Sequence, residues 1–417
     1  MTRMKESGID WIGQIPEEWE MSKIRYLVTT RSEKRITDSS VPYIGLENIE
    51  SQTGKFVKTG IQVDKSENIV VEIGDVLFGK LRPYLRKYWR ATFTSTASSE
   101  FLVFQSSELD MNFLYYAIQS DSFIEEVNTS TYGSKMPRAS WEYIKNMRIA
   151  FPTSLVEQQK IADFLDKKTA QLDKVKSLLE EQIQKLKDYR ASLIYETVTK
   201  GLDKTVPMKD SGIDWVGQVP EGWEVKRLKD YVDFQTGTTP PQSIGVNQER
   251  KGVRWFKPGD FSDESVDLTS AENYITSEIV KQQKLSVYPE KTILVVGIAS
   301  IGKVGYSENH SYSNQQITAL KVTGQTFPKY LAYLMFLSGQ YIRETALYTI
   351  VPIINNQYLS SMKIVLPNCV VQETIVEYLD KKIEQINKMI VIKNEQIKNI
   401  NKQRQTLIYD YVTGKRR

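Results

Sequence analysis

Residues 79–90 hold the densest group of side chains that could bind a charged ligand. The segment reads GKLRPYLRKYWR, in which cations alternate with aromatic rings. The members of interest are Lys80, Arg82, Tyr84, Arg86, Lys87 and Arg90. Lysine and arginine neutralise backbone phosphates, and arginine can donate two hydrogen bonds to a guanine edge in a DNA major groove. A solvated basic face with its aromatic rings in a core is the alternative, but the density of charge favours nucleic acid.

Two other groups of polar residues could take part in the same recognition. Lys135 and Arg138 follow Gly133 in a short basic turn. Asparagine and glutamine pair with adenine through two hydrogen bonds, and polar residues of this kind gather in the second half of the chain. These candidates are His310, Asn314, Gln315, Gln316, Asn355 and Asn356. In loops such residues are also common simply as turn formers.

A glycine-rich stretch at 297–304 comes close to a nucleotide-binding loop. It reads GIASIGKV, whereas the phosphate-binding pattern is GxxxxGK followed by serine or threonine. Val304 has no hydroxyl for Mg²⁺, and Gly305 is a poor first residue for the helix that such a loop requires. ATP binding is therefore disfavoured. We expect instead a glycine-rich turn that holds Lys303 close to some other phosphate.

The residues needed for catalysis or metal binding are scarce. His310 is the only histidine and Cys369 the only cysteine, so neither a zinc cluster nor a disulfide framework is expected. We predict a non-catalytic chain without a metal or cofactor of its own. A single cysteine fits a reducing cytoplasm, and no apolar run approaches the about 20 residues of a membrane helix. The formal net charge of +4 is too small to indicate a polyanion partner by itself.

Two long helices must position these groups, and both can be read from the spacing of leucine and isoleucine. Apolar residues recur at heptad spacing, without proline or glycine, between Pro152 and Gly201, and a related pattern ends the chain. The seams are Leu165, Leu172, Leu179, Leu186 and Leu193 in the first helix, and Leu379, Ile386, Ile400 and Leu407 in the second. We expect an antiparallel coiled coil within one chain, with two unrelated surface helices as the alternative.

The chain is a tandem duplication. Residues 4–20, MKESGIDWIGQIPEEWE, recur almost unchanged at 208–224 as MKDSGIDWVGQVPEGWE. Within the long helices, FLDKK at 164–168 likewise recurs as YLDKK at 378–382. Each copy of the first segment carries two tryptophans, which we expect to be buried in packing rather than to bind a ligand.

Two variable domains lie between the repeated elements. Strand-like runs occur at 41–45, 69–73, 101–104, 292–296 and 317–322, and helical stretches at 111–127 and 327–348. The predicted order is a first variable domain at 1–150, a spacer helix at 151–204, a second variable domain at 205–367 and a second spacer helix at 368–417. The predicted fold class is α+β, with two tandem domains, a coiled coil and pseudo-twofold repetition.

This layout resembles the specificity (S) subunits of type I restriction–modification systems. The resemblance rests on the GIDWIGQIPEEW opening and its repeat, YIGLENI at 43–49, GDVLFGKLRPYL at 74–85 and EQQKIADFLD at 157–166. It covers essentially the whole chain. The second variable domain departs from the first, because it lacks the KLRPYL block and has residues 297–305 in the equivalent region.

The resemblance implies that each variable domain reads one half of a split duplex DNA target, and that the paired helices set the gap between the halves. It also implies docking of methylation (M) subunits, expected to number two, which bind S-adenosylmethionine. Restriction (R) subunits would cut, using ATP and Mg²⁺. The alternative is a coiled-coil scaffold that assembles partners without binding DNA. A fused methyltransferase–nuclease is opposed by the chain length and the missing motifs.

Overall fold

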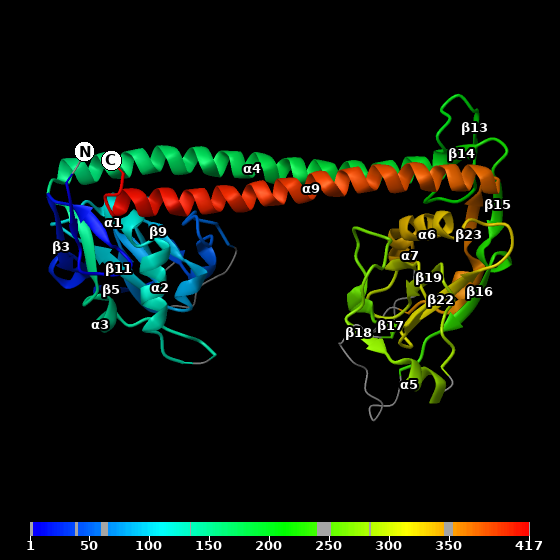
Figure 1. Ribbon diagram of the computed structural model, residues 1–417, viewed down its shortest axis with the longest axis horizontal. Coiled ribbons are helices and arrows are strands. Elements are labelled where there is room, and N and C mark those ends of the chain that lie inside the picture. The colour runs from blue at the N-terminus through cyan, green and yellow to red at the C-terminus, as the bar shows by residue number, and fades with distance from the viewer. Residues whose placement is uncertain are drawn as a thin grey trace. The chain divides into compact units, whose positions relative to one another are not determined.

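The computed structural model describes residues 3–37, 41–59, 66–133, 135–239, 252–282, 285–345 and 353–416 (Figure 1). The chain divides into two compact units: unit 1 comprises Met1–Glu180 and Lys393–Arg417, and unit 2 comprises Glu181–Ile392. The long helices α4 (Leu155–Lys200) and α9 (Cys369–Val412) each give one half to either unit. Each unit is therefore a variable domain combined with half of both long helices.

The described residues of unit 1 form two four-stranded sheets, two strand pairs and several short helices. One sheet has the order β5 (Lys34–Ile36), β7 (Glu67–Val71), β10 (Ser95–Ala97), β6 (Tyr43–Ile44), and the other β4 (Thr29–Thr30), β11 (Phe101–Gln105), β8 (Val76–Gly79), β9 (Tyr88–Arg90). The strand pairs are β1 (Met4–Glu6) with β2 (Gln14–Pro16), and β3 (Trp19–Lys23) with β12 (Arg148–Pro152). The helices are α1 (Met111–Ala117), α2 (Asp121–Thr129), α3 (Trp141–Ile144) and the 3₁₀ turns η1 (Ile24–Tyr26), η2 (Leu46–Asn48) and η3 (Pro83–Leu85).

Unit 2 repeats this plan. Its four-stranded sheet has the order β16 (Val232–Thr236), β22 (Ile317–Val322), β19 (Thr292–Val296), β20 (Val304–Ser307), and a three-stranded sheet has the order β18 (Asn273–Ile275), β17 (Val253–Phe256), β21 (Ser311–Ser313). The strand pairs are β13 (Met208–Asp210) with β14 (Gln218–Pro220), and β15 (Glu224–Arg227) with β23 (Lys363–Leu366). The helices are α5 (Ser277–Gln282), α6 (Pro328–Leu337), α7 (Gly339–Thr345), α8 (Asn356–Ser361) and the 3₁₀ turns η4 (Leu228–Asp230) and η5 (Pro258–Asp260).

Strand β8 is buried on both faces. Val76 and Phe78 belong to one apolar core, whereas Leu77 between them belongs to another. Because successive side chains of a strand point to opposite faces, one continuous apolar run fills two cores. Strand β19 of unit 2 divides its residues between two cores in the same alternating way. The loops that follow β8 and β19 therefore leave from rigid, buried strands.

Each predicted strand run contains a strand, but the runs at 41–45 and 69–73 are extended only at 43–44 and 69–71. The predicted helical stretches are not single helices. Residues 111–127 form α1 and α2 with a break before Asp121, because the Ser120 hydroxyl accepts a hydrogen bond from the Phe123 N–H at 3.4 Å and starts a new helix. Residues 327–345 likewise divide into α6 and α7 at Ser338. The remainder of the second predicted stretch lies outside the described residues.

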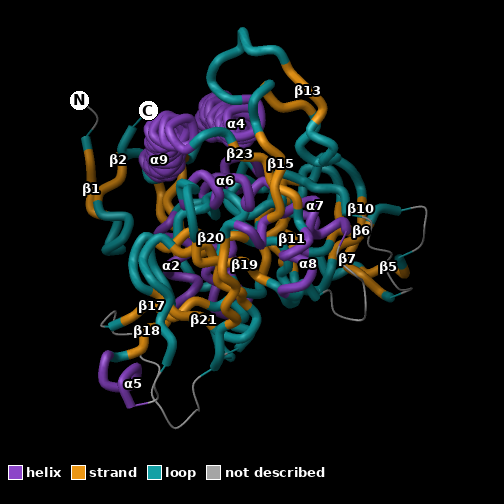
Figure 2. Tube along the Cα trace, turned by 90° about the vertical axis from the view of Figure 1, so that its right-hand side faces the viewer, coloured by secondary structure: helices purple, strands orange, loops and turns teal. Residues whose placement is uncertain are grey.

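The two long helices lie side by side and run in opposite directions, as their seams predict (Figure 1 and Figure 2). In unit 1 the ring of Phe164, near the start of α4, stacks on Tyr411 near the end of α9 at 4.5 Å between centroids. In unit 2 Arg190, near the end of α4, donates to Asn387 Oδ1 in the first half of α9 at 2.6 Å. Leu165, Leu379 and Ile386 are fully buried. The other predicted seam residues are half-buried, as expected for a pair of helices without a third layer.

The duplicated tryptophan segments lie against the ends of the long helices. In unit 1 the Tyr409 hydroxyl donates to the Trp11 carbonyl at 2.8 Å, and in unit 2 the Tyr195 hydroxyl donates to the Val216 carbonyl at 3.0 Å. Trp19 is completely buried and meets Phe113 edge to face. The tryptophans thus serve in packing, as predicted. Each unit is completed by a segment from one repeat and a helix end from the other.

Candidate nucleic-acid interface

In unit 1, two loops that are distant in the sequence join to form one surface, here called loop pair 1 (residues 80–85, 132, 133 and 135–138). The first loop connects β8 to β9 and the second connects α2 to α3. The Arg82 N–H donates to the Pro137 carbonyl at 2.7 Å, and the Ala139 N–H donates to the Lys80 carbonyl at 2.9 Å. A β-bridge between Leu81 and Arg138 lies between these bonds. Loop pair 1 therefore combines the two basic clusters predicted in this domain.

Loop pair 1 is rich in positive charge. It carries Lys80, Arg82, Lys135 and Arg138, and the neighbouring carboxylate is Glu100. The Arg138 guanidinium donates to both oxygens of Glu100, at 3.1 and 2.7 Å. Burial lowers the pKa of the Lys80 ammonium, and the charge of Glu100 partly offsets this effect. The surplus of cations over carboxylates suits a polyanion such as a nucleic-acid backbone.

The backbone of the first loop is held in an unusual conformation. Arg82 and Arg86 have φ angles of 51° and 54°, in the left-handed region that side chains with a Cβ rarely adopt. The Arg82 Nη2 donates to the Lys135 carbonyl at 3.2 Å, whereas its buried Nε has no hydrogen-bond partner among the described residues. Such strain is kept only where the surroundings enforce it, and it clusters at functional sites. The loop thus holds Arg82 in place with one donor unused.

Three other cations of the 79–90 block lie outside loop pair 1. Arg86 Nη1 lies 2.6 Å from Asp121 Oδ1. The Lys87 ammonium is half-buried and donates to the Ile49 carbonyl, and burial lowers its pKa. Arg90 forms two bonds with the carboxylate of Asp166, at 3.1 and 3.2 Å. The sequence-based proposal that these three contact DNA remains a prediction, but each has a partner within the protein.

Tyr84 is half exposed on loop pair 1, and two further exposed side chains there were missed from the sequence. Tyr132 and Met136 are 64% and 50% exposed beside Lys135. Large apolar side chains at such exposure are candidates for stacking on bases or contacting thymine methyl groups. Tyr132 directly precedes the basic run at 133–138 and Met136 lies within it, so their position in the sequence could have identified both.

In unit 2 the equivalent surface, loop pair 2 (residues 297–302 and 353–357), is polar rather than basic. Ile298 and Ile353 form a β-bridge, and the Ile354 N–H donates to the Gly297 carbonyl at 2.8 Å. Gly297 is required there, because a Cβ would lie 2.7 Å from the Ile354 carbonyl oxygen. A pocket of about 410 Å³ opens beside this contact. Its lining includes four of the predicted residues, Gln315, Gln316, Asn355 and Asn356.

The side chains around this pocket are held by specific bonds. Asn355 Oδ1 accepts from the Tyr358 N–H at 2.9 Å and caps α8, and Asn356 Oδ1 accepts from the Thr318 hydroxyl at 3.2 Å. Both amides therefore have their NH₂ groups left as donors in these pairings. Gln315 Oε1 accepts from the Thr239 hydroxyl. The pocket presents amide groups in fixed positions, which suits the reading of adenine edges.

The remaining predicted residues of unit 2 do not line this pocket. Asn314 is buried and donates to Gln316 Oε1 at 2.8 Å. It therefore holds the side chain of Gln316, which lines the pocket. Lys303 donates to the Phe261 carbonyl at 3.3 Å and lies 3.6 Å from Asp263. His310 Nδ1 lies 3.2 Å from the Tyr288 carbonyl. Because strand β20 begins at Val304, the 297–304 stretch is not followed by the helix that a nucleotide-binding loop requires.

Loop pairs 1 and 2 occupy the same topological place. Each joins the loop after a central strand (β8 or β19) to the loop before a short helix (α3 or α8). The framework around them is repeated, but the side chains differ completely: cations and tyrosines in unit 1, amides and isoleucines in unit 2. The two units therefore present chemically different side chains at equivalent places of one framework.

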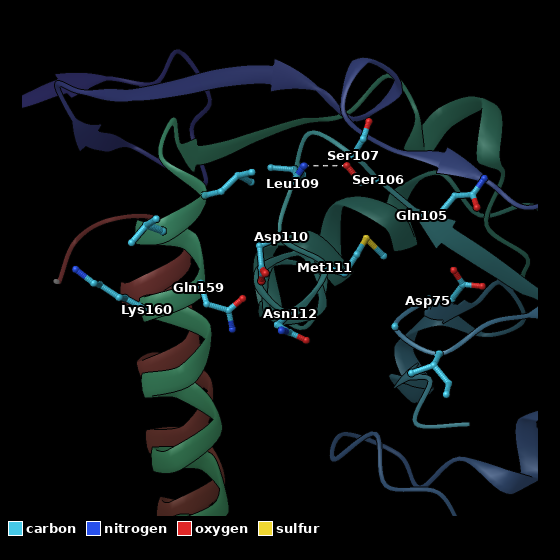
Figure 3. Close-up of a pocket in the computed structure, with 14 residues that line it drawn as sticks. Asp75, Gln105, Ser106, Ser107, Leu109, Asp110, Met111, Asn112, Gln159 and Lys160 are labelled. Atoms are coloured by element: carbon cyan, nitrogen blue, oxygen red, sulfur yellow. Dashed lines mark hydrogen bonds between the residues drawn. The ribbon is translucent and has the colours of Figure 1, made fainter. Parts of the chain in front are cut away.

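A pocket of about 740 Å³ lies in unit 1, lined by residues of α1, the start of α4 and neighbouring loops (Figure 3). Its carboxylates serve structural bonds: Asp110 accepts from the Phe113 N–H at 2.8 Å, and Asp75 accepts from Arg31 at 2.9 and 3.0 Å. Within the described part of the chain, no group of three histidine, cysteine or acidic side chains could hold a metal ion. The described helices include none suited to crossing a bilayer.

This chain is similar to proteins of one family along most of its length. The model of the type I restriction modification DNA specificity domain matches residues 16–187 and 220–399. The MjaVIII specificity subunit of Methanocaldococcus jannaschii is 22% identical, over 96% of this chain and 94% of its own length. The putative MjaX specificity subunit of the same organism is 24% identical, over 97% and 95%.

Solved structures share the fold across the whole chain. A chain from a structural study of assembly and conformational transition in a type I R–M system has a TM-score of 0.75 at 19% identity, over 95% of this chain and 98% of its own. The HsdS subunit from Thermoanaerobacter tengcongensis has a TM-score of 0.54 at 19% identity, over 98% and 99%. Because the family model matches both repeats, this chain belongs to the type I restriction modification DNA specificity family and is a non-catalytic DNA specificity subunit.

Proposed function

We propose that this subunit recognises a bipartite duplex DNA target, with loop pair 1 reading one half-site and loop pair 2 the other. One observation carries the proposal: the two loop pairs lie at equivalent places in a repeated framework yet present different side chains. A protein that recognised the same element twice would have kept the side chains as well as the framework.

The chemistry of each loop pair suggests what it reads. In loop pair 1, Lys80 and Lys135 suit phosphate contacts, and Arg82 suits either a phosphate or the O6 and N7 atoms of guanine. In loop pair 2, the amides of Asn355 and Asn356 suit adenine. Ile353, which is 49% exposed, suits the methyl group of thymine. Sequence readout would therefore differ between the half-sites.

We propose further that the paired helices α4 and α9 set the gap between the half-sites, and that two M subunits and R subunits complete the enzyme in the cytoplasm. Support for two copies of M comes from the repeated start of each long helix. Val156 and the equivalent Val370 are 65% and 72% exposed. Two exposed valines at equivalent places suit contacts with two copies of one partner. S-adenosylmethionine, ATP and Mg²⁺ would belong to the partner subunits.

The test is salt-dependent binding of duplex DNA by the subunit together with its M subunits, measured by fluorescence anisotropy. We expect affinity to fall as salt rises, because cations of loop pair 1 displace counterions from the phosphates. A duplex of random sequence should bind more weakly than a duplex that carries the target sequence methylated by the assembled enzyme. Equal binding of the two duplexes would contradict sequence recognition, and binding without salt dependence would contradict the role of the cations.

A further inference from the structure

The internal repeat places two equivalent arginines in the long helices, and their surroundings differ. Arg190 in α4 begins the sequence RASLIY, and Arg404 in α9 begins RQTLIY. Both are buried, with 7% and 6% of their surface exposed. A buried guanidinium is always charged and is costly unless a carboxylate or several acceptors surround it. Each of these two guanidinium groups therefore needs acceptors or a negative charge close to it.

Arg190 in unit 2 has a carboxylate from its own variable domain. Its Nη2 donates to Glu264 Oε2 at 3.2 Å, and its Nη1 donates to Asn387 at 2.6 Å. Lys187 reaches the other oxygen of Glu264 at 2.6 Å. The Glu264 carboxylate thus bridges two cations of α4 and fixes the second variable domain to the helix pair.

Arg404 in unit 1 has no such carboxylate. Its Nη1 donates to the Gln52 carbonyl and its Nη2 to Gln119 Oε1, both at 3.2 Å and both neutral acceptors. The nearest acidic oxygen, Asp173 Oδ1, lies 3.6 Å from Nε, and this Nε has no hydrogen-bond acceptor among the described residues. Among the described residues, the carboxylate of the first variable domain that is closest in place, Asp121, pairs with Arg86 and not with Arg404.

A pocket of about 290 Å³ lies where the missing carboxylate would be expected. Arg404 lines it together with Arg86, Lys176 and Lys402, and the acids in its wall are Asp121 and Asp173. One further buried polar atom of the lining, Gln405 Oε1, also lacks a hydrogen bond within the described part of the chain. Arg86 Nη1 is paired with Asp121 Oδ1 at 2.6 Å. Two buried groups without a hydrogen bond, and four cations against two carboxylates around one cavity, are a rare combination in folded proteins.

We propose that this pocket binds a tetrahedral oxyanion of the phosphate class, which supplies in unit 1 the negative charge that Glu264 supplies in unit 2. The anion would accept hydrogen bonds from Arg404 and Arg86, with Lys176 and Lys402 closing the site from the two helices. Because Arg86 directly follows loop pair 1, the bound anion would fix the first recognition loop to the helix pair.

A substitution at Gln405 can distinguish phosphate binding in this pocket from a general effect of salt on stability. Gln405→Glu keeps the shape of the side chain and places a built-in carboxylate in the pocket. Lys402→Gln removes an exposed cation of the lining, and Lys398→Gln, an exposed position on α9 outside the pocket, is the matched control. None of these three positions is fully buried, so folding should be preserved.

The experiment is amide hydrogen exchange of the full chain, in inorganic phosphate and in chloride of equal ionic strength. At about twice the Kd for phosphate, exchange around 401–405 should slow about threefold, because bound ligand reduces local opening in proportion to 1 + [L]/Kd. The equivalent segment around 187–191 in unit 2 should not respond. Lys398→Gln should behave as wild type, Lys402→Gln should respond less, and Gln405→Glu should be protected without phosphate and gain nothing from it.

Two results would overturn the proposal. Equal slowing at 401–405 and 187–191 would show only the general stabilisation that phosphate gives to folded proteins. Absence of any slowing would show that Asp173 alone balances Arg404 and that the pocket holds water. If phosphate does slow exchange at 401–405, a further measurement shows whether the natural anion is a DNA phosphate or a free anion. Protection of 401–405 by duplex DNA in phosphate-free buffer would assign the site to a DNA phosphate, and lack of it to a free anion.

Discussion

The Tyr116 hydroxyl donates a hydrogen bond of 2.6 Å to Asp166 Oδ1, and unit 2 repeats the pair as Tyr333 to Asp380 at 2.7 Å. In both units the aspartate also binds a cation from the variable domain, Arg90 at 3.1 Å or Lys329 at 2.9 Å. Burial, and then the bond to the aspartate, raise the pKa of both tyrosines, so they remain donors at neutral pH. Two divergent domains are thus fixed to their helices by one repeated device.

Removing this bond should loosen a domain from its helix. We expect Tyr116→Phe to lower the protection of α1 amides about tenfold in hydrogen exchange, equivalent to about 1.4 kcal/mol for a hydrogen bond to a charged group. Tyr143→Phe is the matched control, because that hydroxyl donates to Glu126 at 2.5 Å on the exposed surface. Equal losses in the two variants would show that the Tyr116 bond is no stronger than a surface contact.

The sequence predicted the repeated framework well and the site only in part. Heptad spacing located both long helices and their antiparallel pairing, because a seam is a local pattern that is read directly. The joining of Lys80 with Lys135 was not predictable, since it depends on a long-range bridge between Leu81 and Arg138. Arg90 was grouped with the DNA contacts because its partner, Asp166, lies far along the chain. Sequence shows which cations are present but not which of them are already paired.

Loop pair 1 predicts how DNA affinity depends on charge. Lys135→Ala should weaken binding to all duplexes and reduce the salt slope by about one, as for loss of a phosphate contact. If Arg82 reads guanine, Arg82→Ala should cost about 1–3 kcal/mol on the specific duplex only. Lys185→Ala, which removes an exposed lysine on α4, is the control for net charge. Affinities unchanged from this control would remove loop pair 1 from the interface.

Glu264 predicts a loss of stability in acid. The bond from Lys187, and then that from Arg190, holds the pKa of Glu264 below its ordinary value. The carboxylate therefore stabilises unit 2 at pH values above its unfolded pKa of about 4.3. This contribution is lost as pH falls through the lower pKa of the folded state. Glu264→Gln should remove this dependence and cost about 1 kcal/mol at neutral pH, since the carboxylate is half exposed.

Urea unfolding of unit 2, followed from pH 7 to pH 3 in both proteins, measures this effect. The two curves should converge at the acid end, because protonated Glu264 and glutamine are both neutral there. A constant difference at all pH values would mean that the loss comes from packing and not from the charge of Glu264.

The helix pair predicts the gap between half-sites. One heptad inserted after Leu179 and another after Lys393 would fall at the boundary between the two units and keep both seams in phase. Each helix would lengthen by about 10 Å, which corresponds to about three base pairs at 3.4 Å per step. We expect methylated sites with a gap longer by that amount and unchanged half-sites. A folded, active variant with the original gap would show that the helices brace the domains without setting their spacing.

Exchange of one variable domain tests whether each unit reads its half-site independently of the other. Residues 228–366 would be replaced by the equivalent region of a relative, and N6-methyladenine would be mapped by single-molecule sequencing in a host that also carries the partner subunits. We expect a two-part methylated motif in which only the half-site read by unit 2 changes, while the other half-site and the gap stay the same. A motif in which both half-sites change would contradict independent reading.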